Sequence, residues 1–258
     1  MPELPEVETI RRDLIKKIVG RKIKNIEVKD KKIGEAKDFA CFLVNKNFTD
    51  IERVGKLLAF RISSGSFLLV HLKMTGQLVF EDKSGLIAGG HSTADNFLLY
   101  KYTRFQITFF GDGNLFFNDL RRFGYVKIVS VKEWEAIKNS YGIEPLQKNF
   151  TLKNLKEALQ GKRNIKAVLL DQKNIAGIGN IYADEILFAA KIKPARPAFS
   201  LKKSEIEKIY KEARRIISLA IKYRGTTFSD YVDASGKKGN YSSFLLVYGR
   251  TGQECYIC

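Results

Sequence analysis

The chain has 258 residues, enough for one large domain or two smaller ones with their own cores, and its hydrophobic content of 45% excludes a disordered protein. Lysine and arginine number 45 against 28 acidic residues, so the net charge of +17 indicates a polyanionic partner, most commonly nucleic acid. No apolar run reaches the roughly 18 residues of a membrane span, and the charged N-terminus is unlike a signal peptide. We therefore expect a cytoplasmic protein that does not bind membranes.

The first predicted element is a helix over residues 4–18, in which Val7, Ile10 and Leu14 keep helical spacing before Gly20. From about residue 21 to 130 the pattern is typical of short strands in a β-sandwich. Such runs occur at 57–62, 67–72, 106–110 and 125–129. The Gly- and Ser-containing segment 81–96 has no clear period and is expected to form a loop.

Helical periodicity returns after Trp134, and residues 141–145 are expected to form an interdomain hinge. Further helices are predicted near 151–160, 164–171, 180–190 and 202–223. The tail from Gly225 is expected to be loop-like, with a terminal hairpin beginning at 244–248. The predicted fold class is α+β, with a β-sandwich domain and its N-terminal helix at 1–133, a helical domain at 146–240 and a terminal segment at 241–258. We expect a basic cleft between the two domains.

The first residues carry a candidate catalytic group. If Met1 is removed, Pro2 has a free secondary amine that can attack a sugar aldehyde carbon and form a cationic iminium ion. An α-amino group has a reference pKa of about 7.7–8.0, so a useful fraction is unprotonated near neutral pH. The carboxyl of Glu3 would then exchange protons with sugar oxygens. On chemistry alone the simpler interpretation is a stiff chain start, with acidic residues favouring the dipole of the helix that follows.

The segment MPELPEVETIRRDL resembles the start of the formamidopyrimidine-DNA glycosylases, bacterial base-excision enzymes that remove oxidised purines. This resemblance implies that Pro2 is the Schiff-base nucleophile and Glu3 the catalytic acid, while Glu6 helps to hold the N-terminus. Lys56, in the motif Arg-Val-Gly-Lys, would contact phosphate and assist elimination after base loss.

Two further motifs resemble the part of this family that fills the gap left by an extruded nucleotide. The motif His-Leu-Lys-Met-Thr-Gly at 71–76 carries Met74, and Asn-Asp-Leu-Arg-Arg-Phe-Gly at 118–124 carries Arg121 and Phe123. Leu120 replaces the usual proline, which costs turn rigidity but no chemistry. Arg121 would reach the orphaned base, while Met74 and Phe123 would enter the base stack.

Another DNA contact is implied at the motif Lys-Tyr-Thr-Arg, residues 101–104, where Tyr102 stands at the position of a family histidine. A phenol can hydrogen-bond a phosphate without carrying positive charge. His91 is the alternative for this contact, and His71 is interpreted as structural.

Residues 161–185 resemble the family's helix–two-turn–helix. Gly177 and Gly179 would permit close backbone approach, so that turn amides and a helix N-terminus hold a DNA phosphate. Tyr182 would support this turn. The residues assigned to DNA binding here are Lys162, Arg163, Lys166, Asn180 and Tyr182.

Two C-terminal segments also resemble the family. Residues 224–231 and 235–240 resemble the loop that closes over the everted base, with Thr226, Thr227 and Tyr241 as its candidate residues. Cys255 and Cys258 resemble the first half of a zinc finger. Because structural zinc needs four ligands, this half-site alone is not expected to hold Zn²⁺, and no other cofactor is expected.

The resemblance implies a monomeric, bifunctional DNA glycosylase and abasic-site lyase of base-excision DNA repair, working at the bacterial nucleoid. Its partner would be double-stranded DNA with formamidopyrimidines, 8-oxoguanine or abasic sites. Two alternatives stay open: an endonuclease VIII-like enzyme for oxidised pyrimidines, and a protein that binds damaged DNA without excising the base. Lesion preference discriminates the first, and the intact pair Pro2–Glu3 argues against the second.

Overall fold

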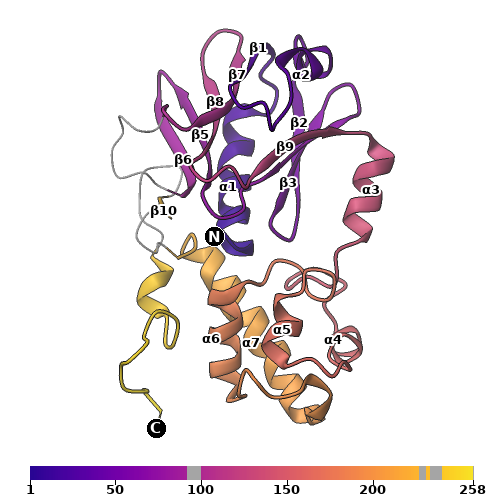
Figure 1. Ribbon diagram of the computed structural model, residues 1–258, viewed down its shortest axis with the longest axis vertical. Coiled ribbons are helices and arrows are strands. Elements are labelled where there is room, and N and C mark those ends of the chain that lie inside the picture. Colours follow the sequence, from indigo (N-terminus) through magenta and orange to yellow (C-terminus); the bar gives the residue numbers. More distant parts are fainter. Residues whose placement is uncertain (92–99, 227–230, 233–239, 258) are drawn as a thin grey trace.

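The structure, a computed structural model, describes residues 1–91, 100–226, 231–232 and 240–257. Figure 1 shows strands gathered in the upper part of the molecule and helices in the lower part, with the N-terminus at their junction. This confirms the predicted α+β fold class. In the part of the chain that is described, no helix is long and apolar enough to cross a membrane.

The upper part contains two antiparallel sheets, as predicted for a β-sandwich. The six-stranded sheet has the order β1-β7-β8-β5-β6-β10, formed by Ile23–Val28, Thr103–Phe109, Asn114–Asp119, Gly76–Asp82, Gly85–His91 and Tyr231–Val232. The four-stranded sheet has the order β2-β3-β4-β9, formed by Phe48–Val54, Leu57–Ile62, Phe67–His71 and Tyr125–Val129. Strand β10 follows the helical part in sequence and returns to pair with β6, so the two parts share a sheet.

Helix α1 (Leu4–Ile18) has the predicted bounds and packs into the core of the upper part. Its buried residues Val7, Ile10 and Leu14 join the same cluster as side chains from both sheets. A Cβ atom on Gly89 of β6 would lie only 2.5 Å from Cγ1 of Ile10, so this glycine permits the close approach of helix and strand.

The four-stranded sheet is buried on both faces. Phe60 of β3 points into the main core, whereas Ala59 and Phe67 join a second cluster around Trp134. Trp134 belongs to α3 (Val131–Asn139), which is capped by Ser130, whose Oγ accepts a hydrogen bond from the N–H of Glu133 at 3.2 Å. Burial on both faces explains why the sequence of β3 is a continuous apolar run rather than an alternating one.

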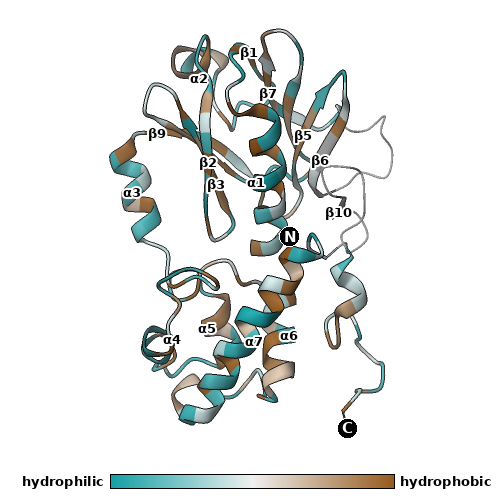
Figure 2. Ribbon diagram, turned by 180° about the vertical axis from the view of Figure 1, so that it is seen from behind, coloured by the Kyte–Doolittle hydropathy of each residue, from teal (hydrophilic) through white to brown (hydrophobic). Residues whose placement is uncertain are grey.

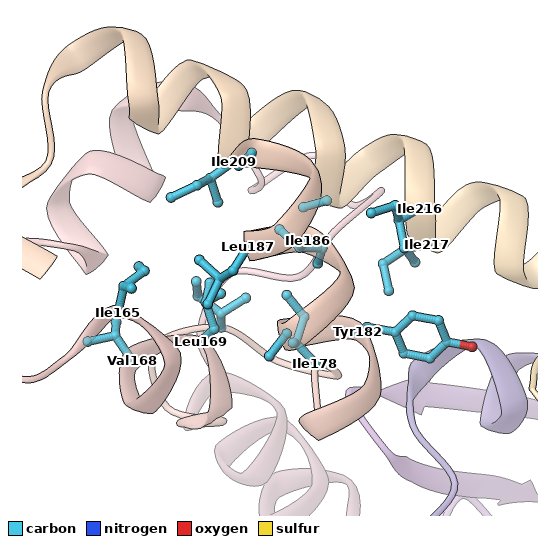
Figure 3. Close-up of a cluster of buried hydrophobic side chains, with 14 of the residues drawn as sticks. Ile165, Val168, Leu169, Ile178, Tyr182, Ile186, Leu187, Ile209, Ile216 and Ile217 are labelled. Atoms are coloured by element: carbon cyan, nitrogen blue, oxygen red, sulfur yellow. The ribbon is translucent and has the colours of Figure 1, made fainter. Parts of the chain in front are cut away.

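The lower part has its own core, built by α4 (Leu152–Ala158), α5 (Ile165–Leu170), α6 (Asn180–Ala190) and α7 (Lys203–Lys222). Figure 3 shows Ile186 and Leu187 of α6 facing Ile209 and Ile217 of α7, with Tyr182 at one end of the cluster. Figure 2 shows hydrophilic and hydrophobic residues side by side along α7, as its amphipathic sequence requires. All four predicted helices of this part are therefore confirmed.

Three expectations were wrong. Most of the segment predicted as a loop forms β5 and β6, a hairpin up to His91, while residues 92–96 lie outside the described residues. An unexpected helix α2 (Ala36–Leu43) interrupts the strands, with Phe39 and Leu43 buried one turn apart. The tail forms a short 3-10 helix at Tyr241–Phe244 instead of beginning a hairpin at 244–248.

Candidate active site

The carboxyl of Glu3 binds the first turn of α6. The side chain is only 3% exposed, and its oxygens accept hydrogen bonds from the N–H groups of Gly179 at 2.6 Å, Ile181 at 2.9 Å and Tyr182 at 3.4 Å. The first N–H groups of a helix have no partners within it, and this carboxylate satisfies them. Glu3 already uses these three amides, and a phosphate contact through the rest of this turn stays a prediction.

The two glycines before α6 make room for the N-terminus of the chain. A Cβ atom on Gly179 would lie 2.4 Å from Cδ of Glu3 and 2.7 Å from Nζ of Lys56. One on Gly177 would lie 2.5 Å from Cδ1 of Leu4, whose N–H donates to the Gly177 carbonyl at 3.0 Å. The close approach expected at these glycines is present, but it serves Glu3 and Leu4.

Glu6 lies at the centre of a second group of hydrogen bonds. Its Oε2 accepts from the backbone N–H of Glu3 at 2.9 Å, which fixes the residue that follows Pro2. Its Oε1 accepts from the hydroxyl of Tyr182 at 2.7 Å and from the N–H of Thr226 at 2.9 Å. Glu6 thus joins α1, α6 and the start of the segment after α7.

Three residues predicted to meet DNA or the lesion are buried: Tyr182 is 0% exposed, Tyr241 3% and Thr226 4%. The ring of Tyr241 lies 5.9 Å from that of Tyr182, and Thr226 pairs with Asn240 in an isolated β-bridge. In this structure these side chains contact other parts of the chain, and their contacts with DNA or the lesion stay a prediction. They hold together the two ends of the segment 226–240, and Thr227 lies outside the described residues.

The surroundings of Glu3 bring the pKa of its carboxyl close to neutral pH. Burial raises the pKa of Glu3 to about 7, against the opposing charge of Lys56 and with the assistance of the negative charge of Glu6. Lys56 is also buried at 5% exposed, and burial lowers its pKa although Glu3 and Glu6 raise it. The predicted catalytic residues Glu3, Glu6 and Lys56 are brought together, next to a buried Pro2 under an exposed Met1.

A second cluster of predicted residues lies exposed on the surface. Met74, from the turn between β4 and β5, is 44% exposed, and Phe123, from the turn after β8, is 52% exposed. The guanidinium of Arg121 lies 4.8 Å from the Phe123 ring, and its Nη1 lies 3.6 Å from Sδ of Met74. The structure therefore brings together, from two separate turns, the three residues predicted to fill the gap left by an extruded nucleotide. Exposed apolar side chains gathered in this way are typical of a binding surface.

Asp119 organises these turns and was missed by the sequence analysis. It is 1% exposed, and its carboxyl accepts hydrogen bonds from the hydroxyl of Thr75, from the N–H of Arg121 at 3.2 Å and from the N–H of Gly124 at 2.7 Å. The available signal was its place directly before the turn, where Asp side chains commonly bind the next backbone amides.

The remaining predicted DNA contacts are dispersed. Lys162 and Asn180 are exposed, whereas Arg163 pairs with Asp171 at 2.6 Å and Lys166 pairs with Asp184 at 2.7 Å. Partly exposed ion pairs of this kind are weak, so they leave both cations able to exchange partners.

Tyr102 is half-buried, and its carbonyl accepts from the N–H of Asp119 at 3.0 Å. His91, the alternative to Tyr102, pairs with Tyr231 through the backbone ladder of β6 and β10. His71 accepts a hydrogen bond from the N–H of Lys73 at 3.0 Å, and burial lowers its pKa to about 3. A neutral imidazole acting as an acceptor agrees with its structural interpretation.

The residues described at the C-terminal end do not fit a zinc ion. Cys255 is exposed and its Sγ accepts from the N–H of Ile257 at 3.4 Å, whereas Cys258 lies outside the described residues. Within the described ranges, no group of three or more His, Cys, Asp or Glu residues could hold a metal ion. We therefore derive no step of the chemistry from zinc.

The first testable prediction concerns the pH dependence of stability. The folded state raises the pKa of Glu3 from 4.5 to about 7, so the stabilisation from its protonated form is complete below the lower value and lost as pH rises through the higher one. We expect the free energy of unfolding of the wild type, relative to Glu3→Gln, to fall by roughly 3 kcal/mol over this window. Urea unfolding across the window measures it, with Glu27→Gln as an exposed control. A difference independent of pH would contradict the assignment.

The second prediction concerns Asp119. Its replacement by alanine leaves the N–H of Gly124 and the hydroxyl of Thr75 without their acceptor, so we expect a loss of about 1–3 kcal/mol in the free energy of unfolding. Arg121→Ala keeps the backbone N–H and removes only an exposed side chain, so it should cost no more than about 0.5 kcal/mol. Equal losses in the two variants would show that Asp119 does not organise the turns.

Comparison with known proteins matches both parts of the fold. Residues 1–126 match the family model of the formamidopyrimidine-DNA glycosylase N-terminal domain, and residues 141–232 match that of the formamidopyrimidine-DNA glycosylase H2TH domain. The formamidopyrimidine-DNA glycosylase of Carboxydothermus hydrogenoformans is 44% identical over 262 residues, covering 100% of this chain and 92% of the relative. That of Moorella thermoacetica is 40% identical over 264 residues, with the same coverage.

Solved structures agree with this assignment. The complex between the Lactococcus lactis Fpg and an abasic site containing DNA is 33% identical with a TM-score of 0.86, covering 99% of this chain and 91% of that one. A mutant of the same protein in complex with a Fapy-dG containing DNA has a TM-score of 0.85 at 33% identity, covering 100% of this chain and 92% of that one. The matches in sequence and in structure extend over both parts of the fold, and they show that this chain belongs to the formamidopyrimidine-DNA glycosylase family.

Proposed function

We propose that this protein is a bifunctional DNA glycosylase and abasic-site lyase that removes oxidised purines from duplex DNA. The observation that carries the proposal is the environment of Pro2. The next residue is fixed at both ends, its N–H by Glu6 and its carboxyl by α6, and that carboxyl has a pKa of about 7. A nucleophile at Pro2 would therefore have a proton carrier at a defined position beside it. The relatives' complexes with abasic-site and Fapy-dG DNA support this class of substrate.

Substrate binding would begin with the charge of the chain. The net charge of +17 attracts the phosphate backbone, and Lys162, Asn180 and Tyr102 are proposed to contact it. Arg163 and Lys166 would contribute by exchanging their carboxylate partners for phosphates.

A flipped nucleotide leaves a gap in the base stack, and the exposed cluster of Met74, Arg121 and Phe123 has the composition to fill it. The two apolar side chains replace lost stacking, and the guanidinium offers donors to the orphaned base. The two turns that carry these residues share Asp119, which holds the cluster in one arrangement before DNA arrives.

The first chemical step needs Met1 to be removed. The Pro2 nitrogen would then form a bond to C1′ of the sugar as the bond from C1′ to the base breaks, and the base leaves with the electron pair. The nitrogen gives up its own proton and the departing base takes up a proton, so a lone pair on the nitrogen is available for the next step. Opening of the sugar ring at its oxygen needs a proton, which the carboxyl of Glu3 can supply near neutral pH. The product is an iminium ion between Pro2 and the opened sugar.

Strand cleavage would follow from the iminium. Loss of a proton from C2′ breaks the bond from C3′ to its phosphate oxygen, and a second elimination releases the sugar on the 5′ side. Lys56 is proposed to assist here, since its buried ammonium faces Glu3 and lies at the junction of the two parts. No redox or nucleotide cofactor takes part in these steps.

We further propose that residues 1–133 form the catalytic domain, 146–240 the DNA-binding domain and 241–258 a terminal segment, and that the protein works at the nucleoid in the bacterial cytoplasm. Separate hydrophobic cores above and below the junction support the division. The terminal segment is bound to α6 through Glu185, whose carboxyl accepts from the N–H groups of Leu246, Val247 and Tyr248.

Borohydride trapping tests the proposed function. A duplex with a single 8-oxoguanine is incubated with the protein, and borohydride reduces any iminium to a stable covalent adduct. We expect an adduct with the Met1-free protein and none with Pro2→Gly or with a form that retains Met1, because only the first has a free secondary amine. Binding without an adduct in the Met1-free protein would favour a damage-binding protein. Faster reaction on an oxidised pyrimidine would favour the endonuclease VIII-like alternative.

The exposed cluster gives a separate prediction. Phe123→Ala should slow single-turnover excision from duplex DNA by roughly 10-fold or more, because base–aromatic stacking contributes about 1–3 kcal/mol. Phe110→Ala is a matched control, since Phe110 is 47% exposed on the turn between β7 and β8 and packs against Lys22. Similar slowing in both variants would contradict a specific role for Phe123.

A further inference from the structure

The turn that carries Lys56 is held by two charged side chains. Glu144 accepts a hydrogen bond from the N–H of Gly55 at 2.7 Å, and Arg53 donates to the carbonyl of Gly55 at 2.8 Å. Arg53 also donates to the other oxygen of Glu144 at 2.6 Å, which closes the group. Glu144 is 3% exposed, so these contacts are shielded from water and hold both polar groups of the Gly55 backbone.

This turn is packed between the hinge and the helical part. Gly55 has a φ of +54°, and a Cβ atom on it would lie 3.2 Å from Cε1 of Tyr141 and 3.3 Å from the backbone nitrogen of Gly177. The next residue is Lys56, whose Nζ lies 2.7 Å from the place of a Cβ on Gly179, where the carboxyl of Glu3 also lies. A short run of chain therefore connects Glu144 to the lysine of the active site.

Glu144 itself is fixed to the helical part. The neighbouring Ile143 donates to the carbonyl of Asn174 at 3.1 Å and accepts from the N–H of Ala176 at 2.8 Å. The N–H of Glu144 donates to the side chain of Asn149 at 3.2 Å. The position of its carboxyl therefore depends on the segment that leads to Gly177 and α6. Its hydrogen bond to Gly55 in turn fixes the turn between β2 and β3 of the sandwich.

We infer that Glu144 is a positioning residue for Lys56: from the hinge, it sets the place of the Gly55 backbone, and so of the Lys56 ammonium against Glu3. The inference rests on the proposed function, in which Lys56 and Glu3 act on the sugar. It assigns to the hinge a role in the chemistry, because a change in the relative orientation of the two parts moves Glu144 and therefore the ammonium.

The charges around Glu3 give a readout that a purely structural role would not move. Glu3 faces Lys56 from the β2–β3 turn, Glu6 from its own helix and Tyr182 from α6, and Lys73 in turn faces Lys56. Of these, Lys56 lowers the pKa of Glu3. Displacing the ammonium therefore raises the pKa of Glu3 further, so the carboxyl stays protonated to higher pH and the limb of the pH–rate profile that reports Glu3 moves upward.

The test compares Glu144→Gln with Glu8→Gln. Both substitutions remove one carboxylate partner of Arg53, since Glu8 accepts from its Nε at 3.0 Å, but only Glu144 also binds Gly55. A glutamine at 144 has one acceptor oxygen where the carboxylate has two, so in the present arrangement its NH2 group would face the donor of either Arg53 or Gly55. Glu144→Asp is the second variant; it keeps the charge beside Arg53 and withdraws the carboxyl from Gly55.

Strand cleavage at a preformed abasic site is measured in single turnover across pH, together with DNA affinity and the unfolding midpoint. We expect Glu144→Gln and Glu144→Asp to slow cleavage by roughly 10-fold or more with little change in affinity, because displacing a catalytic group by about 1 Å is that costly. The pH limb should move upward in both variants. Glu8→Gln should keep the limb in place whatever its unfolding midpoint.

Equal rates and profiles for the Glu144 and Glu8 variants would overturn the inference and leave Glu144 as a stabilising residue. So would a wild-type rate and profile in Glu144→Asp. If the wild-type protein without Met1 gives no trapped adduct, the proposed function fails and the inference fails with it. If the wild type is trapped and the Glu144 variants cleave the abasic site with the wild-type rate and pH profile, the inference alone fails.

Discussion

The structure depends on the insertion of one carboxyl into the start of one helix. Glu3 comes from the third position of the chain and binds amides that lie 176 to 179 residues later. Separating the sandwich from the helices would break these three hydrogen bonds, each of which contributes roughly 0.5–1.5 kcal/mol net. The group proposed to move protons therefore also connects the two parts of the fold, and Gly179 leaves the space that its carboxyl occupies.

The same contact sets the acidity of the site, as a comparison within α1 makes clear. Glu3 and Glu8 are both buried acids near the start of the helix, yet the pKa of Glu3 is raised to about 7 and that of Glu8 is lowered to about 2. Burial is the largest influence on each. Glu8 is paired with Arg11, Arg12 and Arg53, whose positive charges lower its pKa more than burial raises it. For Glu3 the charge that lowers the pKa is that of Lys56, and the negative charge of Glu6 raises it. An acid that holds two parts together can carry a proton near neutral pH only because its partners are amides rather than guanidinium groups.

Local sequence was sufficient for most elements and for which residues gather at the site. Periodicity predicted α1 to the residue, and the family resemblance implied that Met74 and Phe123 would lie at one place. It was not sufficient for contacts across the whole chain. Nothing near Gly179 indicates that its amide is already bound to Glu3, and the hydroxyl of Tyr182 looks available to DNA until Glu6 is seen to bind it. The polar groups of this motif were predicted to contact DNA, whereas in the structure they are buried and bind the carboxyls of Glu3 and Glu6.

Helix α6 connects these features, because it binds the carboxyl of Glu3 at its first turn and contributes a second carboxyl, that of Glu185, one turn later. Its first turn binds the carboxyl of Glu3, and one turn later its own Glu185, 3% exposed, binds three successive amides of the terminal segment. These amides are then unavailable to a hairpin partner, which is why residues 244–248 do not begin one. Because a single helix is stiff over this length, the terminal segment is held at a set distance from the carboxyl of Glu3. The N-terminal residues and the terminal segment thus both bind α6, which fixes their relative positions.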